Sequence, residues 1–103
     1  MYAFEQDVPI DAATHSRIMA GLGEELPPGL IAHIALERED GHLSYLDLWQ
    51  TRQDCDRFTE HRLHPVVGAA LHAAGVQVES EPPRRQVNVV DVWGSGFTRT
   101  ATV

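Results

Sequence analysis

Two apolar segments, residues 30–38 and 43–50, flank the dipeptide Asp40-Gly41, and this arrangement constrains the fold of the chain most strongly. Asp-Gly between apolar runs is typical of a β-hairpin with a two-residue type I′ turn. Such a turn predicts one sheet face that carries three cross-strand pairs. These pairs are Leu36 with Tyr45, Ile34 with Asp47, and Ala32 with Trp49. The opposite face would carry Ile31, His33, Ala35, Ser44, Leu46 and Leu48.

Both predicted faces of this hairpin are largely apolar, so both should be covered. Helices of the same chain can cover one face of the sheet. The other face needs a partner, and a second copy of the chain is the simplest candidate, which predicts a homodimer. His33 falls on this second face, so the predicted dimer packing would depend on pH near ~6.5 if the histidine met its symmetry mate.

The rest of the chain predicts two helices and two more strands around the hairpin. These elements are a strand over residues 2–8, a helix over 12–22 capped by Asp11, a helix from Thr51 that kinks or restarts at Pro65, and a valine-rich strand over 86–93. The resulting order, β-α-β-β-α-β, predicts an α+β fold of the ferredoxin-like type, with an antiparallel sheet and two helices on one face. We expect one domain over residues 1–94 and a flexible C-terminal tail over 95–103.

The charge balance limits the classes of partner. Fifteen acidic and eight basic residues give a net charge of −7, which disfavours binding to nucleic acid or to an anionic membrane. The N-terminus lacks the basic region and long apolar run of a signal peptide, so we expect a cytoplasmic protein. The single cysteine, Cys55, has no partner for an internal disulfide, and no spacing of cysteine and histidine fits a zinc site. We therefore expect no metal and no cofactor.

The element order, the Asp-Gly hairpin and the run Asp-Leu-Trp-Gln-Thr at residues 47–51, which leads into a helix, carry a family resemblance. The chain resembles the dimeric α/β-barrel superfamily, in particular the small proteins related to antibiotic-biosynthesis monooxygenases, over about residues 2–93. The resemblance implies a homodimer with two sheets packed face to face and, in each subunit, a cavity between sheet and helices. Family members include oxygenases that oxidise polycyclic phenols without metal or flavin, haem-degrading enzymes, isomerases, and proteins with no known activity.

Only part of the family's residue pattern is present. Trp49 matches the cavity-lining tryptophan of the phenol-oxidising members, whereas Tyr45 and Cys55 replace their asparagine and tyrosine. The three residues of the haem-degrading members are replaced by Asp7, Phe58 and Gly68, so haem degradation is not expected.

A histidine of the second predicted helix also has a family counterpart. His61 precedes Pro65 by four residues, as in many members, if about one helical turn has been inserted. The resemblance would make this histidine a proton carrier.

The predicted register suggests where the chemistry would lie. If Trp49 faces the cavity, Asp47 lies there too, and the first strand would present Ala3, Glu5 and Asp7 on the same side. Two neighbouring carboxylates in a partly apolar pocket raise each other's pKa, and one of them can then act as a general base toward an acidic C–H or a phenol. A deprotonated, electron-rich aromatic molecule can react with dioxygen or close a ring.

The sequence therefore predicts two groups of site residues. The catalytic group is Asp47, Glu5 and His61, and the substrate-binding group is Trp49, Tyr45, Phe58 and Asp7.

Purely structural roles remain as alternatives for these residues. Asp47 could bind a loop amide or an arginine such as Arg62, and Trp49 could belong to the core. Glu5 would be exposed if the register slipped by one residue. Two functions are thus open: a cofactor-free monooxygenase or cyclase-like enzyme acting on a small hydrophobic, aromatic or polyketide-like molecule, or a dimeric module that binds a ligand or partner without turnover. An enclosed cavity reached by Asp47 and Trp49 would favour the enzyme, and a filled one the module.

Overall fold

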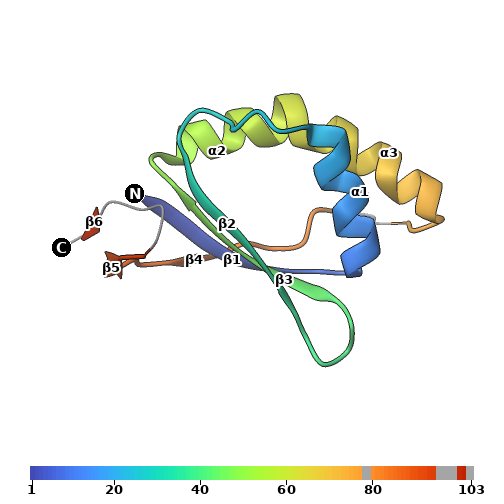
Figure 1. The fold of residues 1–103 in the computed structure, drawn as a ribbon, viewed down its shortest axis with the longest axis horizontal. Coiled ribbons are helices and arrows are strands. Elements are labelled where there is room, and N and C mark those ends of the chain that lie inside the picture. The colour runs from blue at the N-terminus through green and yellow to red at the C-terminus, as the bar shows by residue number, and fades with distance from the viewer. Residues whose placement is uncertain (78–79, 95–99, 102–103) are drawn as a thin grey trace.

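The computed structural model describes residues 1–77, 80–94 and 100–101, and it confirms the α+β class (Figure 1). The elements in chain order are β1 (Tyr2–Val8), α1 (Ala12–Leu22), β2 (Leu30–Glu37), β3 (Leu43–Trp49), α2 (Arg52–Phe58), a π-helical segment η1 (Thr59–Leu63), α3 (His64–Ala74), β4 (Arg85–Val87), β5 (Asp91–Val92) and β6 (Thr100–Ala101). The predicted helix caps are confirmed, since the side chain of Asp11 accepts from the Thr14 amide and that of Thr51 from the Asp54 amide.

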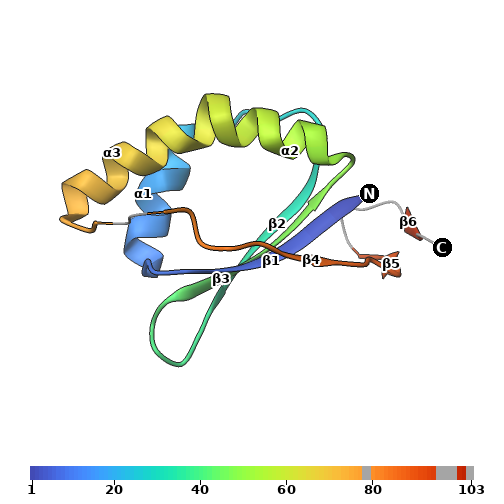
Figure 2. The same ribbon diagram turned by 180° about the vertical axis from the view of Figure 1, so that it is seen from behind.

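The main sheet has four antiparallel strands in the order β2-β3-β1-β4, and the helices lie together on one of its faces (Figure 1 and Figure 2). This arrangement is compatible with a ferredoxin-like fold. The last predicted strand is shorter than expected, because only β4 joins this sheet and β5 pairs with β6 instead. The predicted flexible tail lies mostly outside the described residues. No helix in the described part of the chain is long and apolar enough to cross a bilayer.

The β2–β3 hairpin differs from the prediction in its turn. The Arg38 amide donates to the His42 carbonyl (2.8 Å) and the Gly41 amide to the Arg38 carbonyl (3.0 Å), and Gly41 has φ +84°. These are the features of a three-residue loop with glycine in the left-handed position, which is the second most common kind of hairpin connection. The prediction of a two-residue turn is therefore wrong.

The longer loop moves the strand register by one residue and exchanges the two faces of β2. Asp47 now pairs with His33, and Tyr45 pairs with Ala35. His33 thus lies on the face that is covered by the helices. Its predicted place at a dimer interface is wrong, and a pH-dependent dimer no longer follows from it.

The phase predicted for β1 is wrong in the same way. Its inner-face residues are Tyr2, Phe4, Gln6 and Val8, which pair with Trp49, Asp47, Tyr45 and Leu43. All four are buried, whereas Glu5 and Asp7 are exposed on the outer face. The structure therefore has the predicted alternative register of β1, shifted by one residue, in which Glu5 is exposed. In this register the aromatic and apolar side chains of β1 face the helices, where they are buried.

The core beneath the helices consists of two buried clusters. One lies under α1 and α3 and comprises Val8, Ile10, Ile18, Leu43 and Ala70. The other lies under α2 and comprises Tyr2, Phe4, Trp49 and Cys55. His33 and Asp47, which pair with each other on β2 and β3, lie on the same inner face and are only partly buried.

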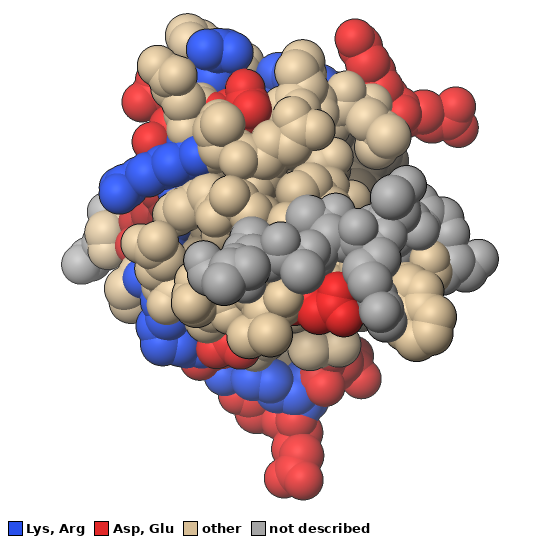
Figure 3. All heavy atoms as spheres, turned by 90° about the vertical axis from the view of Figure 1, so that its left-hand side faces the viewer, with Lys and Arg blue, Asp and Glu red and all other residues tan. Residues whose placement is uncertain are grey.

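The outer face of the sheet is partly apolar and partly charged. Ile34 and Leu36 are 41% and 53% exposed. Arg85 forms ion pairs on this face with Glu5 (3.8 Å) and Asp7 (3.4 Å). Figure 3 views the molecule from the left-hand side of Figure 1 and shows acidic and basic side chains near one another around a largely uncharged surface, apart from the grey atoms.

Candidate functional site

A cavity of about 470 Å³ lies between the inner face of the sheet and the helices. Much of its wall is apolar or aromatic, with side chains such as Phe4, Ile18, Leu22, Trp49, Phe58 and Val67. This volume falls in the usual range for small-molecule sites. The predicted contact of Asp47 and Trp49 with a cavity agrees with this geometry, because both residues line it.

The most polar part of the wall is built by His33 on β2 and by Asp47 and Trp49 on β3. Nδ1 of His33 lies 2.5 Å from Oδ1 of Asp47, and the Trp49 indole Nε1 donates to Oδ2 of Asp47 at 3.2 Å. Both carboxylate oxygens are therefore engaged. Trp49 is only 1% exposed, so its indole holds the carboxylate in a fixed orientation.

The contact with Asp47 also fixes which histidine nitrogen carries the hydrogen. A carboxylate only accepts hydrogen bonds, so Nδ1 of His33 is the donor in this pair. In the neutral imidazole the lone pair then resides on Nε2, which makes no hydrogen bond with the described residues. A carboxylate that orients a histidine in this way is the usual means of preparing an imidazole as a base.

A second polar pair lies beside the first. Nδ1 of His15, on α1, is 2.7 Å from the hydroxyl of Tyr45, on β3. The Tyr45 ring meets the His33 ring edge-on, with 4.6 Å between centroids, and the His15 and His33 rings are nearly parallel at 5.7 Å. The three rings form one cluster at the cavity wall.

The protonation states of this cluster follow from its burial. Burial and, next, the charge of Asp47 raise the pKa of Tyr45 to about 12. Burial and, next, the neighbouring His33 lower the pKa of His15. At neutral pH the cluster therefore contains a neutral phenol beside a neutral His15 imidazole.

Arg62 of η1 lines the cavity but does not contact Asp47, contrary to one predicted alternative. Its guanidinium donates to the carbonyls of Leu22 (3.2 Å) and Glu25 (3.1 Å) and lies over the Phe58 ring, 5.4 Å from the centroid. This arginine thus links η1 to the end of α1 and to the loop that follows it.

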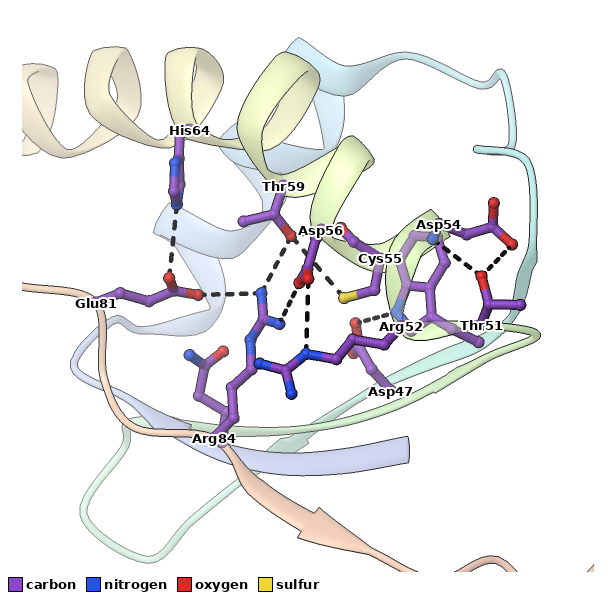
Figure 4. A network of polar contacts seen from close by, with 12 residues as sticks. Asp47, Thr51, Arg52, Asp54, Cys55, Asp56, Thr59, His64, Glu81 and Arg84 are labelled. Carbon is purple, nitrogen blue, oxygen red and sulfur yellow. Dashed lines mark hydrogen bonds and ion pairs between the residues drawn. The ribbon is translucent and has the colours of Figure 1, made fainter. Parts of the chain in front are cut away.

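Arg84 lies at another part of the cavity wall, within the polar network of Figure 4. Its guanidinium contacts Asp56 (3.2 Å), the Thr59 hydroxyl (3.2 Å) and Glu81 (3.4 Å), and it lies over the Phe4 ring, 4.7 Å from the centroid. It therefore joins the segment just before β4 to α2 and η1. The sequence offered no signal for this role, because residues 76–85 read only as a polar connector.

Two of the predicted catalytic residues lie outside the cavity. Glu5 is on the outer face and pairs with Leu46, so the prediction that it neighbours Asp47 beneath the helices is wrong. His61 is exposed and lines a separate hollow of about 220 Å³ beside Pro27 and Pro28. Neither of the two can share a ligand with Asp47 in this arrangement.

The predicted substrate-binding residues are also divided. Trp49, Tyr45 and Phe58 line the cavity as predicted, and Asp7 does not. Asp7 instead accepts hydrogen bonds from the Ser44 hydroxyl and from Arg85 on the outer face, and these two contacts lower the pKa of its carboxyl.

The sequence alone does not place the two histidines of the cluster in the site. A two-residue turn puts His33 on the wrong face, whereas a three-residue loop puts it opposite Asp47, as the structure has it. His15 is predicted from the sequence as a helix-surface residue, and this is wrong, because it contacts Tyr45 at the cavity wall. It lies three residues before Ile18, a core residue of the same helix. Histidine at that spacing on an apolar helix face is the available signal.

The described residues contain no group of three or more histidine, cysteine or acidic side chains that could hold a metal ion. Cys55 is buried, and burial raises the pKa of its thiol, which disfavours the reactive thiolate.

A scan of the sequence against protein-family models finds no match, and a search of curated proteins finds no significantly similar sequence. The resemblance described above therefore rests on the element order and the short motifs.

Proposed function

We propose that this protein is an enzyme that binds a small hydrophobic, aromatic or polyketide-like molecule in the cavity and removes a proton from it, with His33 as the base. One observation carries the proposal: the 2.5 Å contact between His33 and Asp47 at the wall of a largely apolar cavity. Asp47, which the sequence suggested as the base itself, becomes a positioning residue for His33.

Two reactions can follow removal of the proton. In the first, a cofactor-independent monooxygenation, the carbanion of a methylene group transfers electrons to dioxygen. The carbon gains a carbonyl oxygen, and the second oxygen atom leaves as water with the two methylene hydrogens. In the second, a cyclisation, the carbanion attacks a carbonyl carbon of the same molecule. The new carbon–carbon bond forms as the carbonyl π bond breaks, and the alkoxide that results takes the proton back from His33. The resemblance to monooxygenases of antibiotic biosynthesis supports both, since the chemistry begins with the same deprotonation.

We further propose that the protein is a ferredoxin-like dimeric α/β barrel in which a second copy covers the outer face of the sheet. Ile34 and Leu36 on that face are 41% and 53% exposed, and Leu46 lies beside them on β3. Exposed apolar side chains that adjoin each other on a sheet are typical of an interaction surface.

The proposed enzyme is tested by ligand screening with matched variants. A panel of uncharged aromatic ketones and phenols is screened by thermal shift against the wild type, His33→Ala and His61→Ala. Molecules that stabilise the wild type are then incubated with it and followed by mass spectrometry and by an oxygen electrode. We expect His61→Ala to react as the wild type does and His33→Ala to bind without reacting. Equal turnover by His33→Ala would refute His33 as the base.

The alternative function, a module that binds without turnover, is favoured by one specific observation. The polar groups of the site largely satisfy one another, because Asp47 is paired with His33 and Trp49, and Tyr45 with His15. A network of polar groups that satisfy one another can also have a purely structural role, because it holds the core in one arrangement. Ligands that stabilise the wild type and His33→Ala equally, and that are recovered unchanged, would select this alternative.

A further inference from the structure

We infer that the cavity selects an uncharged carbonyl compound that can enolise, and that Tyr45, oriented by His15, donates the hydrogen bond to its carbonyl oxygen. The inference rests on the proposed function, because it takes His33 as the base, and it adds the substrate class and a second catalytic residue.

The charges around the cavity disfavour an anionic ligand. The two arginines that line it are both engaged, Arg62 with backbone carbonyls and Arg84 with Asp56 and Glu81. The remaining charged groups of the wall are mostly acidic, and they include Glu24, Glu25, Glu81 and Asp47. A carboxylate or phosphate entering this cavity would lose its hydration without gaining a free cation among the described lining residues. The net charge of −7 opposes its approach as well.

His64 does not change this balance. It lines the cavity, but its Nε2 lies 3.7 Å from Oε2 of Glu81. Any positive charge on this imidazole is therefore partly compensated by the same glutamate that contacts Arg84.

Tyr45 is suited to donate to a ligand oxygen. Its pKa of about 12 keeps the phenol protonated at neutral pH. When the His15 Nδ1–H group donates to the phenol oxygen across their 2.7 Å contact, the phenol hydrogen is free to point into the cavity. His15 is then a positioning residue, because it selects the direction of the Tyr45 hydrogen.

The base and the donor lie close enough to act on adjacent atoms of one molecule. The rings of His33 and Tyr45 are 4.6 Å apart between centroids and line the same wall. The C–H bond next to the carbonyl breaks, and its proton moves to Nε2 of His33. The electron pair forms a carbon–carbon double bond and shifts the carbonyl π electrons onto oxygen, where the Tyr45 hydroxyl stabilises the negative charge. Return of the proton completes the exchange, so no oxidant is consumed.

The test uses 2-tetralone, an uncharged bicyclic ketone with acidic hydrogens beside its carbonyl. Proton NMR in D₂O follows the replacement of these hydrogens by deuterium in the presence of the wild type, His33→Ala, Tyr45→Phe, His15→Gln and His61→Ala. We expect the wild type and His61→Ala to accelerate exchange equally and His33→Ala to abolish the acceleration. Tyr45→Phe should lower the maximal rate by roughly 100-fold, in line with the loss of one donor to an oxyanion. His15→Gln should lower the maximal rate without changing the concentration of ketone at half-saturation.

Charge selection is measured in the same samples with a matched pair of aromatic ligands. 2-Naphthol and 2-naphthoate have the same ring system, and only the second is an anion at neutral pH. We expect 2-naphthol to inhibit the exchange and 2-naphthoate to inhibit at least ten times more weakly. Inhibition by both at equal concentration would overturn the inferred selection against anions.

The outcomes separate this inference from the proposed function. Exchange that needs His33 but proceeds at the full rate in Tyr45→Phe overturns the role of Tyr45 and leaves the base in place. Absence of acceleration by the wild type, or full activity of His33→Ala, counts against the proposed function itself. Circular dichroism and thermal melting show whether each variant is folded, and His15→Gln supplies a second measure of the role of Tyr45 should Tyr45→Phe fail to fold.

Discussion

His33 and Asp47 are directly opposite one another on the neighbouring strands β2 and β3, and Nδ1 of the histidine lies 2.5 Å from Oδ1 of the aspartate. Directly paired residues on antiparallel strands have short separations between their Cβ atoms, so the backbone register alone brings the two side chains together. The dyad is thus a property of the sheet. It depends on the pairing of β2 with β3, whose register is set by the three-residue hairpin loop, and on one indole contact from Trp49.

Replacement of Asp47 by asparagine should destabilise the protein, because the histidine and the indole would lose a charged acceptor. A hydrogen bond to a charged group contributes about 1.5–3 kcal/mol, so we expect Asp47→Asn to lower the free energy of unfolding by about 2 kcal/mol. Urea unfolding at neutral pH measures the change. Glu39→Gln removes the same charge from an exposed residue of the hairpin loop and should change stability by less than about 0.5 kcal/mol. Equal effects of the two substitutions would show that the dyad contributes no stability.

The ionisation of Tyr45 should be visible as a late step in an alkaline titration. The chain has two tyrosines, and burial raises the pKa of Tyr45 from 10.0 to about 12. Phenolate absorbance in the ultraviolet should therefore show a step near pH 12 that is absent from Tyr45→Phe. A titration of the wild type with no step above the ordinary tyrosine range would contradict the burial of this phenol.

The same shift makes stability depend on pH. Between pH 10 and 12 the tyrosine of the unfolded chain ionises while Tyr45 of the folded chain stays protonated. The unfolded state then binds fewer protons, so the free energy of unfolding falls as the pH rises through this window. The contribution is complete below pH 10, and Tyr45→Phe should show a smaller alkaline loss in denaturant unfolding. Identical losses in both proteins would refute the assignment.

Much of the fold could be predicted from the sequence because it depends on local signals. Asp11 and Thr51 start helices through their side-chain caps, and the apolar runs on either side of Asp40-Gly41 form the expected hairpin. Caps and turns act over three or four residues, so they can be read without knowledge of the tertiary structure.

The site could be predicted only in part, since it depends on strand register. Tyr45, Asp47 and Trp49 are every second residue of the strand β3, so they share one face of the sheet by β geometry alone. His33 and the β1 residues come to that face through pairings that one extra loop residue reverses. Contacts between residues that are far apart in the sequence, such as those of Arg84 with Asp56 and Thr59, have no local signal.

Alanine substitutions at two glycines, Gly41 in the hairpin loop and Gly68 in α3, should change stability in opposite directions. Gly41 has φ +84°, and a side chain there would meet no other atom, so Gly41→Ala should cost only the conformational penalty of about 1–2 kcal/mol. Gly68 lies within α3, and a methyl group there would also meet nothing. Gly68→Ala should therefore stabilise the protein by about 0.5–1 kcal/mol. Chemical unfolding of both variants measures these opposite signs, and a neutral Gly41→Ala would contradict the loop conformation.

The outer face of the sheet provides the test of the proposed dimer. Leu36 is 53% exposed in the single chain, so Leu36→Glu should leave each subunit folded while placing a charge within the proposed contact. Burying an unpaired carboxylate is costly, and the dissociation constant should rise by at least about 10-fold. Sedimentation velocity over a range of micromolar concentrations measures it. Ala73→Glu adds the same charge to an exposed position of α3, in the helical layer, and should leave the association unchanged. A wild type that sediments as a monomer throughout this range would refute the dimer, and an equal effect of both substitutions would place the contact elsewhere.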